Sequence, residues 1–458
     1  MQISSVQNRP VSPVRPASRP PQKEAIATDQ VSLSEAPTRV YSEAFGKIRH
    51  LALQLDHDVP PNIRNEVFNA WFQVFETMDD KTRFTIVLES DEDRQALAQR
   101  LEERNIPNRE RFGLMVNDGL DITMWARDQM IGMRNADGSA RLLGQTTMRD
   151  HGDDEQLPPR IAEFAGVELD ADKRLVTDGG DEVSNTNESF LGFTSLYLTA
   201  KKLYDEEHPG QSTTPFSVTM VEDNTNVGYH FEPNLYKSTQ GPGEEHWLGL
   251  AHGIFEEKYG HKVTVVGADD PSTPELEVPA TFHIDMGLTP VDNHTVLVGD
   301  PSWARSTIAG LSPDEYADHN RRLNQNLGTE GQDHLAALVH QNTEGDPLLQ
   351  HQFDHNAQLM RDRGYNVVRL PYLEGPPELP WVTYNNCLME NYVDDGGHQV
   401  KRVFLPTYDL PALDSRASQV YQSLGFEVIP LKLPALTSWR GAIRCISNVL
   451  ERGPAQTA

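Results

Sequence analysis

Two features are scarce in this chain, and each shortage limits what the protein can be. Only two cysteines, Cys387 and Cys445, occur among 458 residues, too few for a disulfide framework, and free thiols are typical of a reducing compartment. No apolar run approaches the roughly 20 residues that cross a bilayer, and no hydrophobic segment follows Met1 as in a standard signal peptide. We therefore expect a protein without membrane contact that is cytoplasmic, or exported by a non-classical route through its N-terminal tail.

Basic residues are also in short supply. There are 40 Lys and Arg against 68 Asp and Glu, for a formal net charge of -28. This balance argues against nucleic acid or an anionic membrane as partner, because both are bound through positive charge. It favours a cationic partner, or simply solubility.

The N-terminal segment differs in composition from the rest. Residues 1–40 are rich in Pro, Ser and Arg and bury little apolar surface, so we predict a disordered tail. Residues 41–458 then form the folded part. This part is long enough for two or three domains, although large α/β folds also run long as single units.

Helical and strand patterns alternate through the folded part, which predicts an α/β fold. Residues 83–88 are typical of a strand, and Ser90 is placed to cap a helix that runs to Arg104. Around Gly260, Gly364 and Gly425 a helix is expected to end in a glycine cap, followed by a short β-branched strand. The irregular spacing of these glycines indicates a repeated αβ module with insertions. The alternative is that they show only the helix–glycine–strand order that is common in α/β proteins.

The segment Phe282–Met286 alternates apolar and polar residues without interruption. Successive side chains of a strand point to opposite faces, so a strand here would place His283 and Asp285 side by side and turn the apolar residues to the core. A rigid element that holds an imidazole and a carboxylate together is how active sites are usually built.

A second segment, Trp125-Ala126-Arg127-Asp128, combines an aromatic ring with a carboxylate. A planar cation could lie against the ring of Trp125 and donate paired hydrogen bonds to Asp128. The alternative is a core tryptophan beside a surface Arg–Asp pair. Taken alone, this segment favours the alternative.

Two further segments carry reactive side chains. Asp178-Gly179-Gly180 allows close backbone approach and offers a carboxylate to a cation, but it lacks the spacing of a calcium loop, so we expect no metal there. A tight acidic turn is the alternative. Cys445, beside small residues near the end of the chain, is either a nucleophile or a small buried hydrophobe, and Cys387 fits the second description better.

Taken together, these motifs resemble a known family. Trp-x-Arg-Asp, acidic-Gly-Gly, His-x-Asp and Gly-x-x-x-Cys follow one another between about residues 113 and 452, in the order typical of the guanidine-modifying (pentein) superfamily. The resemblance is greatest to peptidyl-arginine deiminase and agmatine deiminase. It implies a five-bladed, pseudo-symmetric α/β propeller with its site at the centre. Arg444 stands where many members have His, and Asp178 stands where many have Glu.

The resemblance also implies a reaction. Asp128 and Asp285 would clamp a guanidinium group, Cys445 would attack its carbon as a thiolate, and His283 would serve as acid and base. Trp125, Asp178 and Arg127 are expected in substrate binding.

The implied product is a ureido group, citrulline if the substrate is arginine in a peptide, with release of ammonia. No metal or organic cofactor is implied. The expected partner is a cationic guanidino substrate, possibly an arginine-containing peptide or protein.

Several alternatives stay open on the sequence alone. An amine in place of water would make the protein an amidinotransferase, and the substrate could be agmatine or free arginine rather than a peptide. For free arginine, Arg127 and Arg444 are possible partners of the substrate carboxylate. A protein of another class, a catalytically silent pentein that binds a cationic partner, also fits the composition. The oligomeric state is not indicated.

Overall fold

The computed structural model describes most of the chain after its N-terminal tail. The described residues are 38–117, 119–149, 151–211, 215–216, 220–222, 229–231, 243–268 and 279–454. Residues 1–37 of the predicted tail lie outside them. Arg39 and Val40, which the prediction assigned to the tail, instead form a short strand paired with Met133 and Arg134, so the tail was predicted slightly too long.

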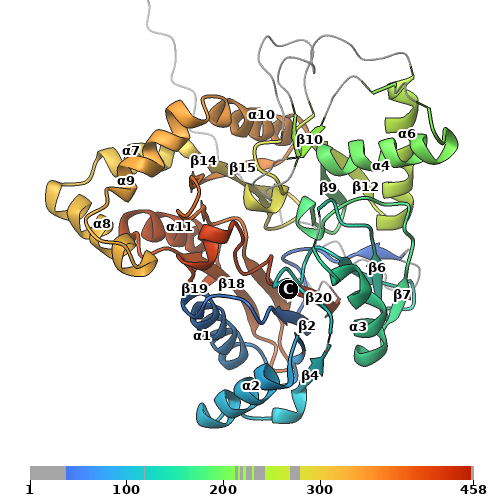
Figure 1. The fold of residues 1–458 in the computed structure, drawn as a ribbon, viewed down its shortest axis with the longest axis horizontal. Helices are drawn as coiled ribbons and strands as arrows, with labels where there is room; N and C mark the ends of the chain where they lie inside the picture. Colours follow the sequence, from blue (N-terminus) through green and yellow to red (C-terminus); the bar gives the residue numbers. More distant parts are fainter. Residues whose placement is uncertain are drawn as a thin grey trace, which may run out of the picture.

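Five small sheets surround a common centre, with most helices on the outside (Figure 1). Each sheet follows one plan: an antiparallel pair of strands, a helical connection, and a third strand parallel to the second. The plan has a physical reason, since antiparallel neighbours can be joined by a tight turn whereas parallel neighbours need a crossover. The predicted five-bladed α/β architecture is therefore confirmed.

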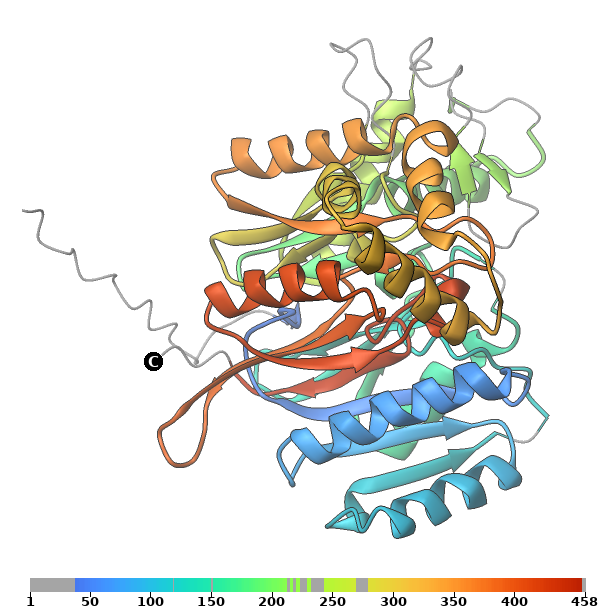
Figure 2. The same cartoon turned by 90° about the vertical axis from the view of Figure 1, so that its left-hand side faces the viewer.

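Sheet I brings the two ends of the described chain together. Its order is β20-β2-β3-β4, and Ile48 pairs with Arg452 where β2 meets β20. In the side view of Figure 2, its two helices flank its strands. Its elements are β2 (Ile48–Leu55), α1 (Pro61–Thr77), β3 (Arg83–Leu88), α2 (Asp91–Glu103), β4 (Phe112–Val116) and β20 (Ser447–Arg452).

Sheets II and III follow in the chain. Sheet II has the order β1-β5-β6-β7 and sheet III the order β12-β9-β8, with the small β10-β11 pair inserted before the last strand of sheet III. The elements of sheet II are β1 (Arg39–Val40), β5 (Met130–Arg134), β6 (Ala140–Gly144), α3 (Leu157–Ala165) and β7 (Glu168–Asp170). Those of sheet III are β8 (Glu182–Ser184), β9 (Glu188–Gly192), α4 (Phe193–Glu207), β10 (Met220–Glu222), β11 (Tyr229–Phe231), α6 (Glu244–Tyr259) and β12 (Lys262–Val266).

Sheets IV and V complete the ring. Sheet IV has the order β13-β14-β15-β16, with four helices in its crossover, and sheet V the order β17-β18-β19, with one. The elements of sheet IV are β13 (Leu288–Pro290), β14 (Thr295–Asp300), α7 (Pro301–Ala309), α8 (Pro313–Leu327), α9 (His334–His340), α10 (Leu349–Asp362), β15 (Asn366–Leu373) and β16 (Val382–Thr383). Those of sheet V are β17 (Leu388–Val393), β18 (Gln399–Thr407), α11 (Pro411–Ser423) and β19 (Glu427–Lys432).

The predicted local signals are present in the structure. Ser90 caps α2 by accepting a hydrogen bond from the Asp93 amide at 3.1 Å. Gly260, Gly364 and Gly425 follow α6, α10 and α11 with φ values of 64°, 90° and 84°, a left-handed conformation that glycine adopts without steric penalty. Each leads into the parallel strand of its sheet.

The predicted strand at Phe282–Met286 is wrong. His283 is extended, but Ile284–Met286 form a single 3-10 turn before β13 begins at Leu288. The reason lies in the backbone hydrogen bonds. The Ile284 amide donates to the Asp181 carboxylate at 3.3 Å, and the Met286 amide donates to the His283 carbonyl at 3.2 Å. Alternation over five residues could not reveal that these amides are used outside a sheet.

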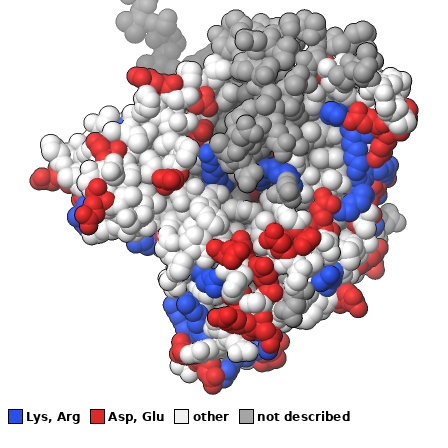
Figure 3. All heavy atoms as spheres, in the orientation of Figure 1, with Lys and Arg blue, Asp and Glu red and all other residues white. Residues whose placement is uncertain are grey.

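The distribution of surface charge and the length and polarity of the helices complete the description of the fold. Acidic side chains cover much of the lower half of the face in Figure 3, with basic ones between them. Among the described helices, none is both long enough and apolar enough to traverse a bilayer.

Candidate active site

The segments that enter the first strand of each sheet all carry a polar side chain toward the centre. The register of the five sheets therefore places residues from five distant parts of the chain in one region. Taken in ring order, these residues are Cys445 before β20, Asp128 before β5, Asp178 before β8, His283 and Asp285 before β13, and Asn386 before β17.

A pocket of about 460 Å³ opens at this centre. Asp128, His283 and Cys445 line it together with the aromatic rings of Trp125, Phe282 and Trp439. The polar groups therefore lie between apolar walls, as is usual for a pocket that binds a small ligand. The structure thus brings three of the four predicted catalytic residues to one cavity.

His283 lines the pocket, and Asp178, which does not line it, contacts the His283 imidazole. His283 Nε2 lies 2.9 Å from Asp178 Oδ2, and His283 Nδ1 lies 3.9 Å from Asp128 Oδ1. The imidazole therefore lies between two carboxylates, with one ring nitrogen toward each. Gly180 makes this packing possible, because a Cβ there would lie 2.4 Å from His283 Nδ1. This contact explains the second glycine of the Asp-Gly-Gly motif.

Two residues that the sequence analysis missed lie beside these groups. The guanidinium group of Arg149 stacks over Phe282 at 5.0 Å and lies 3.3 Å from Asp178 Oδ2 and 3.8 Å from Asp128 Oδ2. His151 Nε2 lies 3.7 and 3.8 Å from the same two carboxylates. Both residues belong to one short segment before α3, and its cluster of ionisable residues was the available signal.

These contacts shift the ionisation of the buried groups. Burial alone would raise the pKa of Asp178, but its contacts with His151 and His283 and the charge of Arg149 hold that pKa well below the usual range. Burial lowers the pKa of His151, but the carboxylates of Asp178 and Asp128 outweigh it and leave the pKa raised. Asp178 therefore stays ionised at neutral pH.

Cys445 also lines the pocket. Its side chain is 3% exposed, and its sulfur receives a hydrogen bond from Asn386 Nδ2 at 3.1 Å. Asn386 Oδ1 accepts in turn from the Arg444 amide at 3.0 Å. Burial raises the pKa of the Cys445 thiol, and the charges of Asp285 and Asp128 raise it further. The thiol is therefore protonated while the pocket holds no added cation.

Asp285 is not among the residues that line the pocket, but it shares the side-chain amide of Asn386 with Cys445. Its Oδ2 accepts from Arg444 Nη1 at 2.7 Å and from Asn386 Nδ2 at 2.9 Å. Its Oδ1 is buried and has no hydrogen-bond partner among the described residues. Burial raises its pKa, and the charges of Arg444 and His283 limit the rise. One oxygen of Asp285 thus has capacity for a further donor.

The structure does not bring Arg127 to the pocket. Its Nε donates to the Gly179 carbonyl at 2.8 Å, and its Nη2 lies 3.2 Å from Glu182 Oε2. Arg444 is held in a similar way, with a two-point contact to Glu43 at 2.6 and 3.0 Å. Both guanidinium groups are buried in ion pairs beneath the site, so neither is placed to meet a substrate.

The pocket mouth carries the most exposed aromatic residue of the site. Trp439 is 42% exposed, and next to it Arg440 adopts a left-handed conformation with φ 68° and lies over the ring of Trp381 at 5.5 Å. Deeper in, Trp125 packs so closely on Gly441 that a Cβ there would lie 2.2 Å from the indole. The glycine before the cysteine is thus required by Trp125.

This arrangement suits a planar cation. Asp128 Oδ1 and Asp285 Oδ1 are buried acceptors that lack a donor within the described part of the chain, and buried polar atoms in proteins are nearly always paired. Guanidinium N–H groups would satisfy such oxygens with charge-assisted hydrogen bonds. The aromatic walls would pack on its face.

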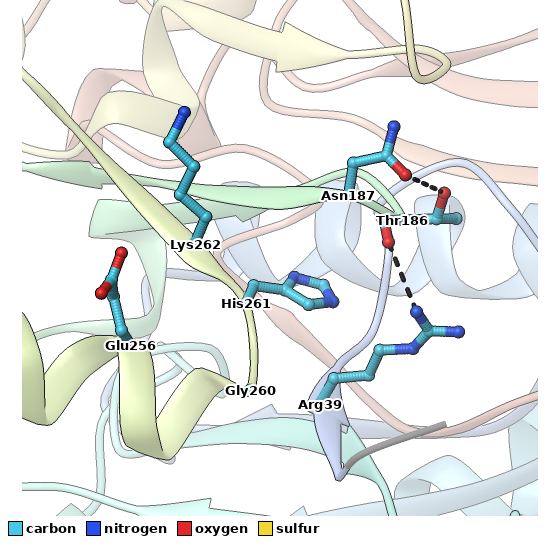
Figure 4. Close-up of a pocket in the computed structure, with 7 residues that line it drawn as sticks. All are labelled: Arg39, Thr186, Asn187, Glu256, Gly260, His261 and Lys262. Carbon is cyan, nitrogen blue, oxygen red and sulfur yellow. Dashed lines mark hydrogen bonds between the residues drawn. The ribbon is translucent and has the colours of Figure 1, made fainter. Parts of the chain in front are cut away.

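A second, larger hollow of about 710 Å³ lies on the surface between β1, the β8–β9 turn and the end of α6. Figure 4 shows Arg39, His261 and Lys262 around it. Burial and then the charge of Arg39 lower the pKa of His261 to about 4, so this imidazole is neutral at pH 7. No cysteine lines this hollow, and none of the predicted site residues lies there.

Comparison with known proteins identifies solved structures that share this fold. No protein-family model matches the chain, and no curated protein does either. Among solved structures, a candidate arginine deiminase from Porphyromonas gingivalis is 16% identical with a TM-score of 0.52, over 90% of this chain and 97% of that one. A candidate peptidyl-arginine deiminase is 14% identical with a TM-score of 0.53, over 91% and 99%.

The agmatine deiminase of Enterococcus faecalis is 14% identical with a TM-score of 0.52, over 91% of this chain and 96% of that one. Matches of this extent and low identity establish the fold. The chain has the pentein fold, in agreement with the resemblance that its motifs indicate.

Proposed function

We propose that this protein is a deiminase-type hydrolase that converts a guanidinium group to a ureido group and releases ammonia. The observation that carries the proposal is that Asp128, His283 and Cys445, from three distant segments, line one pocket. The pentein fold supports it, because a solved neighbour with this fold is an agmatine deiminase. The proposal assigns the predicted folded part, residues 41–458, together with the strand at Arg39–Val40, to a single catalytic unit.

Binding of the cation prepares the nucleophile. A guanidinium group held by Asp128 and Asp285 would neutralise the two charges that raise the pKa of Cys445, so the thiol could pass its proton to His283 once substrate is bound. The hydrogen bond from Asn386 would then stabilise the thiolate. The substrate thus helps to activate the residue that attacks it.

The reaction then proceeds in two stages. The Cys445 thiolate attacks the guanidinium carbon, and a proton from His283 lets one nitrogen leave as ammonia. The guanidino carbon is then bonded to the sulfur of Cys445. His283 next removes a proton from water, the water oxygen bonds to the same carbon, and the carbon–sulfur bond breaks to release the ureido product and the thiolate. Asp178 orients His283 throughout.

Peptidyl-arginine is the leading form of the substrate, with agmatine and free arginine as small-molecule forms. The exposed Trp439 at the mouth leaves room for a chain attached to the guanidino group. Arg127 and Arg444 are buried in ion pairs, which leaves Arg440 and Arg149 as the arginines that line the pocket. Among the described residues, a partner for the carboxylate of free arginine would come from these two.

A substrate panel tests the proposal. Wild-type protein should release ammonia and a ureido product from at least one of an arginine-containing peptide, arginine and agmatine, and Cys445→Ala should abolish both. Cys387→Ala is the matched control, because Cys387 is buried beside the Tyr421 hydroxyl at 3.3 Å and does not line the pocket. If wild type and Cys445→Ala perform alike, the proposal is wrong. Added glycine that receives an amidino group would instead favour an amidinotransferase, and binding without turnover would favour a silent pentein.

A further inference from the structure

Asp128, Asp178 and His283 form a buried cluster of metal-ligand side chains. One ligand atom from each lies within 4.8 Å of the others, and each side chain is at most 3% exposed. Across the described ranges of the chain, no other set of three or more such residues meets this distance criterion. We call these three residues the Asp–Asp–His cluster.

Unpaired atoms around the cluster are a second, independent observation. Asp128 Oδ1 and His283 Nδ1 have no hydrogen-bond partner among the residues that the structure describes, and the same holds for the neighbouring His151 Nε2. The His151 side chain is only 5% exposed, and its Nε2 faces both carboxylates at 3.7 and 3.8 Å. Buried donors and acceptors in this state mark a place where a ligand completes the bonding.

In the free protein, Arg149 supplies the positive charge at this place. Its guanidinium group lies 3.3 Å from Asp178 and 3.8 Å from Asp128, and the side chain is 19% exposed. It also lies 3.2 Å from His283 Nε2 and stacks on Phe282 at 5.0 Å, so it contacts all three residues of the cluster. Because solvent reaches one side of it, the guanidinium group can leave without opening the core.

We propose that the Asp–Asp–His cluster binds a divalent transition-metal ion of the zinc class, which replaces the Arg149 guanidinium group. Mixed imidazole and carboxylate donors suit such ions, whereas calcium and magnesium prefer oxygen alone. Metal–ligand bonds of roughly 2.0–2.2 Å require donor atoms a little over 3 Å apart. The 2.9 Å separation of His283 Nε2 and Asp178 Oδ2 is close to that spacing. Cys445 is not one of the ligands.

The bound ion acts as an inhibitor, not as a cofactor, because it occupies groups that would hold substrate and transfer protons. This consequence rests on the proposed function, whereas metal binding itself does not. Zinc should therefore inhibit turnover in competition with the guanidino substrate.

Cobalt(II) titration of the Cys445→Ala variant, followed by visible absorption, tests binding without a thiol and without turnover. We expect one ion per chain, displaced by zinc. Asp178→Asn should weaken binding at least tenfold, because it removes a charged ligand while its amide oxygen can still accept from the Met148 amide. Arg149→Met should strengthen binding several-fold, because the competing cation is gone. His398→Asn, at an exposed histidine, is the control and should change nothing.

The outcomes separate the two proposals. Cobalt binding by wild type but not by Cys445→Ala would show that the thiolate is a ligand and would overturn the inference. Absence of cobalt binding by both proteins would also overturn it. So would a cobalt affinity of Arg149→Met equal to that of the parent protein. If Asp178→Asn fails to fold, Arg149→Met decides. A protein that binds cobalt in this pattern but turns over no guanidino compound would overturn the proposed function and leave the metal site standing.

Discussion

The side-chain amide of Asn386 donates a hydrogen bond to the sulfur of Cys445 across 3.1 Å. A thiolate gains more from this bond than a thiol does, because hydrogen bonds to charged acceptors are stronger. Asn386→Ala should therefore lower kcat by about 10- to 100-fold, which corresponds to about 1.4–2.7 kcal/mol of transition-state stabilisation. Steady-state kinetics on the best substrate of the panel measures this.

Asn386→Asp changes the charge of this side chain but keeps its shape, so it separates the electrostatic effect of Asn386 from its effect on packing. A carboxylate there would face Asp285 Oδ2, now 2.9 Å from the amide, and would oppose ionisation of Cys445. Activity should fall below that of Asn386→Ala, and alkylation of Cys445 by iodoacetamide should need a higher pH. Equal activity in the two variants would show that Asn386 acts only by filling space.

Gly180→Ala should disable the site with little effect on the fold. The new methyl group would lie 2.4 Å from His283 Nδ1, so the imidazole must move away from Asp178. We expect kcat to fall at least tenfold. Gly249→Ala in α6, where no atom lies within 4 Å of the added methyl, is the control and should stabilise the protein by about 0.5–1 kcal/mol. A fully active Gly180→Ala protein would contradict the position of His283.

Glu43 stabilises the floor of the site. Its carboxylate contacts Arg444 at 2.6 and 3.0 Å in a buried pair, and removing one partner of such a pair leaves a charge unsatisfied. Glu43→Gln should lower the free energy of unfolding by about 3 kcal/mol, measured in urea. The control is Glu451→Gln, whose pair with Arg83 is partly exposed, and this change should cost about 1 kcal/mol or less. Similar losses in the two variants would contradict the account.

Asp154 should make stability depend on pH. Burial raises its pKa from 3.8 to about 7, despite hydrogen bonds from Thr123 and Gln54. The unfolded chain therefore gives up this proton first, and stability that is present below pH 3.8 is lost as the pH rises to about 7. Asp154→Asn removes this loss. Its stability relative to wild type should grow by about 2–3 kcal/mol between pH 5 and pH 8, measured by urea unfolding, and a constant difference would contradict the shift.

Local signals in the sequence predicted the elements that depend on local chemistry. The Ser90 cap and the glycines at 260, 364 and 425 placed four helix ends correctly, because capping is decided within a few residues. Closure of the ring has no such signal. It depends on β20 pairing with β2, at the opposite end of the chain, and was expected only through the resemblance of the motifs.

The site divides in the same way. Asp128, His283 and Cys445 stand in motifs and were found, but Arg149, His151 and Asn386 were not. Asn386 lies 59 residues before Cys445 and contacts it only because sheets I and V are neighbours in the ring. The sequence predicted that Arg127 takes part in substrate binding, but the structure buries it in an ion pair with Glu182. The charge of a residue does not reveal which partner the fold will place beside it.

The central claim is that Cys445 forms a bond to the guanidino carbon. Rapid acid quenching during turnover, followed by peptide mass spectrometry, measures this directly, and the buried Cys387 serves as internal reference. We predict an amidino adduct on the Cys445 peptide alone, and no adduct in Cys445→Ala. Product formation without an adduct, or an adduct on Cys387, would contradict the account.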